Sequence, residues 1–251
     1  MSAALPRLWI DGAAFGARVL RGGDDPWSAP GELGLFLREL ASLLSLDIVD
    51  IDIGAGIAAW ARSYGIDRLD AGGIEDLLVD TALRAHLKRG IETAAGALGT
   101  KPLALALPGP GALARLFMEP DGMDENVLDD LGMVLADLLR ALVAPSIGVL
   151  RFTEADSRAL EFFEPLTNIA RHYELTSVLV MPGEASGAAG FDRIYRAEPS
   201  SAAEGRILGP AFWEGGDVVV TGDTPLFTEV PAALVPETVL AKLRVLSENA
   251  S

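Results

Sequence analysis

The 251-residue sequence contains no cysteine, only two histidines and far fewer basic than acidic side chains. Without cysteine the protein cannot form a disulfide, a thiolate nucleophile, an iron–sulfur ligand set or a cysteine-bearing zinc site. The 20 Lys and Arg residues against 36 Asp and Glu residues give a net charge of −16. This charge argues against a nucleic-acid or anionic-membrane partner, because phosphate binding requires clustered basic residues.

Long apolar runs and common nucleotide motifs are also missing. No stretch of about 18 apolar residues could span a membrane, and the N-terminus lacks the basic and apolar regions of a signal peptide. We therefore expect a cytoplasmic protein, and its high Ala, Leu, Gly, Arg and Asp content with few Lys residues is typical of high-GC bacteria. No phosphate-binding, dinucleotide-binding, HExxH, GxSxG or calcium-loop motif is present, so nucleotide and serine-hydrolase functions have no support.

What the sequence does contain is hydrophobic material, which makes up 50% of the residues and can bury a sizeable core. Short apolar runs that end in Gly, Pro or an acidic residue are predicted to be strands: residues 8–11, 47–53, 102–107, 146–152, 177–181, 191–196, 206–208 and 217–221.

Segments with helical periodicity lie between many of these runs: residues 30–44, 74–98, 125–142, 156–173 and 236–248. Asp124 and Asp156 are suited to cap two of these helices, and Pro236 is suited to a first helical turn. Alternating strands and helices predict a single α/β domain over residues 1–251, a (β/α)8 TIM-like barrel. The last connections are too short for full helices, so the second half is expected to have reduced helices or to be an open sheet.

Three segments resemble a known superfamily. They are residues 101–115 with the turn Pro108-Gly109-Pro110, residues 146–156, and residues 215–223 followed by 235–243. The first is similar to a third strand that runs into a Pro-Gly-Pro turn, the second to a strand that ends in an acidic residue, and the last to a final strand and helix. Over residues 45–245 the chain thus resembles a diverged, shortened member of the superfamily of uroporphyrinogen decarboxylase and cobalamin-independent methionine synthase.

The resemblance implies a barrel and an enzyme with a C-terminal active-site face. It implies a decarboxylase-type lyase without a cofactor, acting on a small or medium organic carboxylate, or alternatively a methyltransferase with a corrinoid or tetrahydrofolate carrier. The zinc chemistry of the methionine synthase has no ligand set here, since cysteine is missing and His86 and His172 lie on predicted outer helices. In place of the decarboxylase's arginine-rich loop the chain has Arg18 and Arg21, predicted to lie in a Gly-rich loop after the first strand, where they could clamp a substrate carboxylate.

Acidic residues follow several predicted strands, where TIM barrels carry their active sites. Asp50 and Asp52 are two residues apart and point to the same face of a strand, while Val49 and Ile51 face the other way. Two adjacent carboxylates in a dry pocket raise one pKa and give an acid beside a base, or could bind a divalent cation. We predict Asp50, Asp52 and Glu154 as catalytic residues, although solvated loop acids are the alternative interpretation.

Further residues at the end of a predicted strand or in the loops that follow are candidates for substrate binding. They are the acids Asp11, Glu184 and Asp223, a proton donor Tyr64, and two aromatic residues that could cover an apolar substrate, Trp27 and Trp213. Ordinary packing and solvation would explain each of them as well. A third hypothesis for the whole chain is a non-catalytic barrel that serves as a binding or assembly subunit, with an exposed apolar sheet covered by a second copy in a homodimer.

Overall fold

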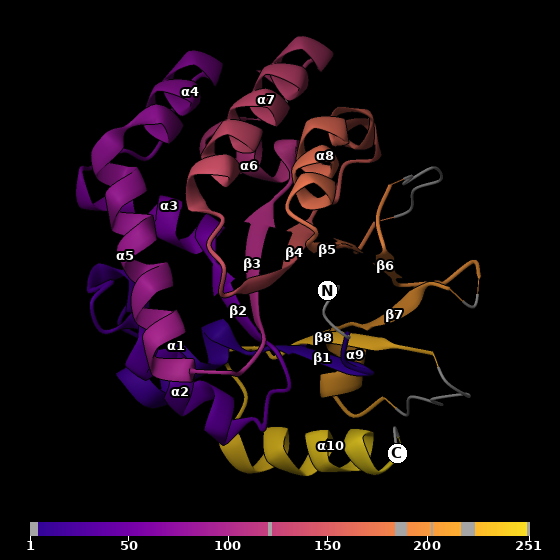
Figure 1. Cartoon of the computed structure of the whole chain (residues 1–251). Helices are drawn as coiled ribbons and strands as arrows, with labels where there is room; N and C mark the ends of the chain where they lie inside the picture. The colour runs from indigo at the N-terminus through magenta and orange to yellow at the C-terminus, as the bar shows by residue number, and fades with distance from the viewer. Residues whose placement is uncertain (1–4, 120–121, 184–189, 202, 217–223, 250–251) are drawn as a thin grey trace.

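A computed structural model describes residues 5–119, 122–183, 190–201, 203–216 and 224–249. Its strands are β1 (Leu8–Asp11), β2 (Val49–Asp52), β3 (Leu103–Pro108), β4 (Ile147–Thr153), β5 (Thr176–Met181), β6 (Arg193–Arg196), β7 (Gly205–Leu208) and β8 (Leu226–Glu229). They form one sheet in the order β1-β8-β7-β6-β5-β4-β3-β2, and every neighbouring pair is parallel. The sheet curls into a nearly closed TIM-like barrel, as predicted (Figure 1). Among the described residues β1 and β2 share no ladder, so the barrel has its seam there.

Helices surround the first half of the barrel much more fully than the second (Figure 1). The first half carries α1 (Ala13–Arg21), α2 (Leu33–Leu43), α3 (Ile53–Ser63), α4 (Ala71–Val79), α5 (Thr81–Leu98), α6 (Pro110–Phe117), α7 (Glu125–Leu142) and α8 (Glu164–His172). After β5 the described residues add only α9 (Pro210–Trp213) and the C-terminal α10 (Pro236–Asn249). The prediction of reduced helices in the second half is confirmed.

The eighth strand is not where the sequence pattern placed it. The apolar run predicted as the last strand, residues 217–221, lies outside the described residues. The strand that pairs with both β1 and β7 is β8, at Leu226–Glu229. This strand has four residues, and its two apolar ones, Leu226 and Phe227, are adjacent, so it shows no alternating pattern.

Two predicted helices are each divided by a residue that starts a new one. Asp80 has a non-helical backbone and accepts hydrogen bonds from the first amides of α5, so residues 74–98 belong to two helices. Asp156 caps a short 3-10 helix, η3 (Ser157–Phe162), and α8 begins separately beyond Phe163 with a proline in its first turn. The predicted caps Asp124 and Asp156 are both confirmed, Asp124 by a hydrogen bond from the Val127 amide.

The segment after β1 was expected to be a loop, but it forms α1. Gly12 caps this helix and Gly16 lies inside it against α2, where an added Cβ atom would come within 2.6 Å of the Leu40 side chain. Gly16 therefore permits close packing of two helices, whereas the sequence pattern made it a sign of a loop.

The core has two layers separated by the sheet. Val49 and Ile51 belong to the larger apolar cluster between strands and helices, while the interior cluster contains Trp9, Ala104, Val149, Val178, Tyr195 and Phe227. The alternation along β2 thus turns Asp50 and Asp52 toward the barrel interior, as expected. Within the described residues no helix combines the length and apolar character that a membrane span needs.

Candidate active site

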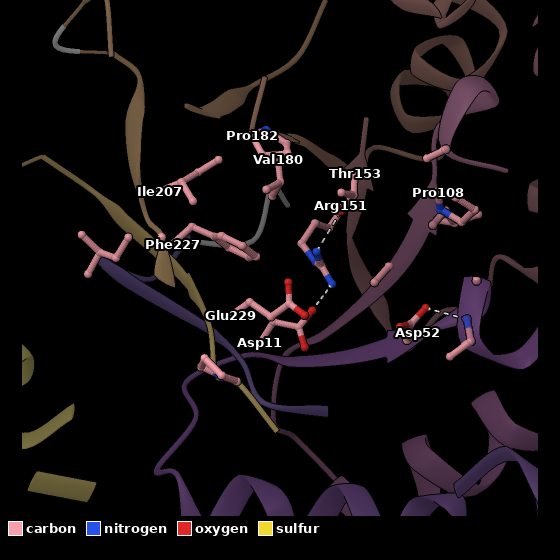
Figure 2. A pocket seen from close by; sticks show the side chains of 18 of the residues that line it. Asp11, Asp52, Pro108, Arg151, Thr153, Val180, Pro182, Ile207, Phe227 and Glu229 are labelled. Carbon is pink, nitrogen blue, oxygen red and sulfur yellow. Dashed lines mark hydrogen bonds and ion pairs between the residues drawn. The ribbon is translucent and has the colours of Figure 1, made fainter. Parts of the chain in front are cut away.

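A cavity of about 740 Å³ opens at the carboxyl ends of the strands. Asp11 ends β1, Asp52 ends β2 and Glu229 ends β8, and all three line this cavity together with Arg151 of β4. Asp11 and Glu229 are register neighbours on β1 and β8, and Figure 2 shows both below the Arg151 guanidinium, with Asp52 on a separate wall. The strand ends therefore collect three carboxylates and one guanidinium around a single space.

Arg151 occupies the centre of this arrangement with a side chain that is only 5% exposed. Its Nη2 atom donates to Asp11 Oδ2 at 2.7 Å, its Nε atom to Asp50 Oδ1 at 3.2 Å and its Nη1 atom to Thr153 Oγ1 at 3.2 Å. The guanidinium carbon lies 5.4 Å from the centre of the Phe227 ring. Burial alone would lower the pKa of Arg151, but the neighbouring Asp50, Asp11 and Asp52 raise it, so the guanidinium stays charged.

Asp50 lies behind the cavity wall rather than on it. Its Oδ2 atom accepts a hydrogen bond from Trp9 Nε1 at 3.0 Å, and its Oδ1 atom accepts the one from Arg151. Burial raises the pKa of Asp50 to about 6 although Arg151 opposes the rise. The position and contacts of Asp50 suit a residue that holds Arg151, rather than one that touches a ligand.

Asp52 faces the cavity and shares a row of the sheet with Arg151. The register pairs Asp52 with Ala106 and Ala106 with Arg151, so a small side chain on β3 separates the carboxylate from the guanidinium. Asp52 Oδ1 accepts a hydrogen bond from the Ala55 amide at 2.9 Å and thereby caps α3. Burial and the charge of Asp11 raise the pKa of Asp52, which brings it toward the range useful for proton transfer.

Glu229 is the most exposed of the three acids on the wall. Partial burial, followed by the charges of Asp11 and Asp52, raises the pKa of Glu229, while Arg151 lowers it. Asp52 and Glu229, the two cavity-lining carboxyl groups whose pKa is raised, belong to different strands and flank the same cavity.

The surroundings of Glu154 are those of a helix-capping group. Its side chain is fully buried and its two oxygens accept hydrogen bonds from four backbone amides, those of Gly111, Ala112, Ala155 and Asp156, at 2.8–3.1 Å. Arg115 Nη1 donates a further one at 3.3 Å. The amides at the start of α6, where the Pro-Gly-Pro turn ends, are therefore occupied by Glu154, which is not among the residues that line the cavity.

The two arginines predicted to hold a carboxylate lie on α1 and do not line the cavity. Arg18 donates to the Leu234 carbonyl oxygen, and Arg21 lies 3.9 Å from the carboxylate of Glu32. The segment predicted to be a Gly-rich loop carrying a substrate clamp is thus a helix, and the arginine at the cavity is Arg151.

Of the remaining predicted site residues in the described parts of the chain, only Trp213 lines the cavity. Trp213 lines the cavity and donates from Nε1 to Thr228 Oγ1 at 3.0 Å. Trp27 is buried against His86, and Tyr64 is 65% exposed beside Trp60, so neither reaches the cavity. Glu184 and Asp223 lie outside the described residues.

Sequence reasoning missed Arg151, Glu229 and Phe227. Arg151 had a detectable pattern, since it is a charged residue inside an otherwise apolar strand and such residues are rarely buried without a partner. Glu229 and Phe227 could not be found because their strand was not recognised.

No group of three or more His, Asp or Glu side chains in the described parts of the chain could hold a metal ion. No protein-family model matches the sequence, and no curated protein is significantly similar to it. The resemblance to the uroporphyrinogen decarboxylase superfamily therefore stays a prediction.

Proposed function

We propose that the protein is a lyase-type enzyme that works without a bound cofactor and transfers a proton on a small or medium organic substrate. The convergence of Asp11, Asp52 and Glu229 around Arg151 carries this proposal. A volume of about 740 Å³ lies in the range of small-molecule sites, and TIM barrels place their active sites at this face.

The chemistry follows from the two kinds of group on the wall. A lyase step leaves an electron pair on a carbon atom or on the oxygen conjugated with it, and a nearby cation stabilises the developing charge. Arg151 would serve as this cation, and Asp52, with its raised pKa, would take up or supply the proton. Glu229 would be a second acid on the opposite wall.

Solvent deuterium provides a test that does not require the natural substrate. Organic acids, ketones and hydroxy compounds would be incubated with the protein in D2O and examined by mass spectrometry for carbon-bound deuterium. We expect wild-type protein to label at least one compound and Asp52→Asn to lose the labelling. Asparagine is also a good helix N-cap, so the variant should retain α3.

Asp76→Asn on the exposed face of α4 is the matched control and should label like the wild type. Circular dichroism and urea unfolding would establish that both variants fold. Labelling that persists in Asp52→Asn, or no labelling of any compound by the wild type, would contradict the proposal.

Methyl transfer is the second candidate, and the acidic cavity wall favours it. Carboxylates such as Asp52 and Glu229 could hold a positively charged methyl donor or the amide and amine edge of a pterin. Cobalamin or tetrahydrofolate would then raise the melting temperature, because a ligand of the native state stabilises it.

A further inference from the structure

Arg151 has more hydrogen-bond donors than its described partners use. A guanidinium carries five N–H groups, and the bonds to Asp11, Asp50 and Thr153 occupy three of them. Two N–H groups thus have no acceptor in the described residues, although the side chain is 5% exposed and lines the cavity. Buried donors of this kind are normally satisfied, so the site is equipped to receive an oxygen atom of a ligand.

The charge of Arg151, in contrast, is already balanced. Asp11 and Asp50 both form ion pairs with it, and Asp52 and Glu229 add further carboxylates beside the cavity. No other Lys or Arg is found among the described residues that line the cavity. A carboxylate or phosphate at Arg151 would therefore meet an excess of negative charge, whereas a neutral oxygen would not.

The walls determine the rest of the ligand. Val180, Ile207, Phe227 and Trp213 contribute apolar side chains to the cavity lining, and the small Ala106 side chain lies between Asp52 and Arg151 in the sheet. An organic cation would satisfy the carboxylates but would leave the two N–H groups of Arg151 without an acceptor. A ligand with an apolar body and a neutral carbonyl group meets both requirements.

We propose that the substrate is a neutral carbonyl compound with an apolar body, whose oxygen accepts hydrogen bonds from Arg151 and whose adjacent carbon faces Asp52. This inference rests on the proposed function. Asp52 takes the proton from that carbon, the C–H electrons form the carbon–carbon double bond of an enolate, and the carbonyl electron pair moves to the oxygen beside Arg151. The proton on Asp52 then returns to that carbon. Alternatively, the carbonyl forms again, the enolate carbon–carbon pair becomes a double bond to the next carbon, and the bond from that carbon to a leaving group breaks, the group departing with its electron pair and taking the proton from Asp52.

Three compounds with the same ring test the substrate class: cyclohexyl methyl ketone, cyclohexanecarboxylate and cyclohexylmethylammonium. Their affinities for the full-length protein would be measured by calorimetry or ligand-observed NMR at neutral pH. We expect the ketone to bind at least about tenfold more tightly than the carboxylate, which corresponds to a modest like-charge penalty. Tightest binding by the carboxylate or the ammonium compound, or no binding of the ketone up to its solubility, would overturn the inference.

Two variants test the charge argument without touching Arg151, whose loss would leave buried carboxylates unpaired. Glu229→Gln removes one negative charge from the wall and should raise the affinity for the carboxylate relative to the ketone several-fold. Glu92→Gln, on the exposed surface of α5, should leave the ratio unchanged. An unchanged ratio in Glu229→Gln would overturn the charge argument.

Deuterium labelling of the bound ketone separates this inference from the proposed function. Ketone binding with the expected selectivity but no labelling would contradict proton transfer and leave the substrate class standing. Labelling of the carboxylate with no binding of the ketone would support proton transfer and contradict the proposed substrate class.

Discussion

Asp52 and Glu154 are both carboxylates at the end of a strand, and their hydrogen bonds assign them different roles. One oxygen of Asp52 accepts the hydrogen bond that caps α3, and its side chain faces the cavity. The oxygens of Glu154 accept hydrogen bonds from four amides and an arginine. For both residues the sequence offered a position at the end of a strand, and for Asp52 it also offered the strand face shared with Asp50; neither shows which atoms the carboxylate contacts. The chemistry of a carboxylate depends on which of its oxygens remain open.

Glu154→Gln should therefore lower stability. A glutamine amide would place an NH2 group against backbone N–H donors, leaving buried groups without partners. We expect a loss of about 3 kcal/mol in the free energy of unfolding, measured with urea. Glu161→Gln, at an exposed position of η3, is the control and should change stability by less than about 0.5 kcal/mol. Unchanged stability with loss of activity would instead support the catalytic role predicted for Glu154.

Asp50 should make stability fall as pH rises between about 4 and 6. Its pKa is raised from 3.8 to about 6 in the folded protein, so the folded state binds a proton in this range that the unfolded state has released. The contribution of Asp50 is fully present below its unfolded pKa and is lost as pH passes its folded pKa. A shift of this size corresponds to about 3 kcal/mol.

Asp50→Asn isolates this effect because other titrating groups largely cancel in the comparison. The free energy of unfolding of the wild type minus that of Asp50→Asn should fall as pH rises from 4 to 6 and level off above that range. Burial sets the sign of the shift; of the charged neighbours, Arg151 lowers the pKa of Asp50 and Asp11 raises it. A difference that rises with pH would show that the ion pair with Arg151 outweighs burial.

At the scale of single elements, Asp80 determines where α5 begins. Its side chain accepts hydrogen bonds from the amides of Ala82 and Leu83, and its backbone is non-helical. Asp80→Ala should cost about 1 kcal/mol in urea unfolding, as the loss of a helix N-cap does. Asp76→Ala, on the exposed face of α4, should be neutral or slightly stabilising. Equal effects of both substitutions would show that the Asp80 cap contributes nothing.

Helices and strands were predicted well where the hydrophobic periodicity extends over many residues. They were predicted poorly where tertiary packing determines the local structure. The predicted helix 125–142 coincides with α7, whose apolar positions recur over five turns' worth of chain and whose cap Asp124 is typical. α1 was missed because Gly16 contacts α2, a reason visible only in three dimensions. β8 was missed because its four residues carry no period.

The site was predicted only in part, because some of its residues follow a local pattern and others are brought in by packing. Period-two alternation was enough to turn Asp50 and Asp52 into the barrel. It could not show that Arg151, about a hundred residues further along the chain, pairs with Asp50, since such pairing depends on the order of strands. Arg18 and Arg21 were selected by resemblance and proximity to β1, and neither lines the cavity.

At the scale of the whole molecule, the expected basis for a homodimer is not found in the described residues. None of the most exposed large apolar side chains lies on β5, β6 or β7; three of them, Val235, Leu240 and Val245, lie on α10 or next to it. On β6, Arg196 is buried and pairs with Glu204 at 3.0 Å. A homodimer stays a prediction without the exposed sheet that suggested it.

Side chains bridge the seam of the nearly closed barrel, where no backbone ladder in the described part of the chain joins β1 to β2. β1 pairs only with β8 and β2 only with β3 among the described residues. Across this gap Trp9 donates to Asp50, and Arg151 forms ion pairs with Asp11 of β1 and Asp50 of β2. The groups that hold Arg151 at the cavity therefore also join the first and second strands.

Trp9→Phe tests this double role. The substitution removes the Nε1–H donor but keeps an aromatic ring in a fully buried position, and we expect a loss of about 2 kcal/mol in unfolding free energy. Because β1 and β2 lose a connection, amide hydrogen exchange should accelerate in residues 8–11 and 49–52 more than in β4 and β5. Trp213→Phe, which removes a comparable bond to Thr228, should leave exchange in β2 unchanged. Uniform acceleration in all strands of the Trp9→Phe variant would mean that the seam opens only with global unfolding. The contact of Trp9 with Asp50 would then give the seam no local stability of its own.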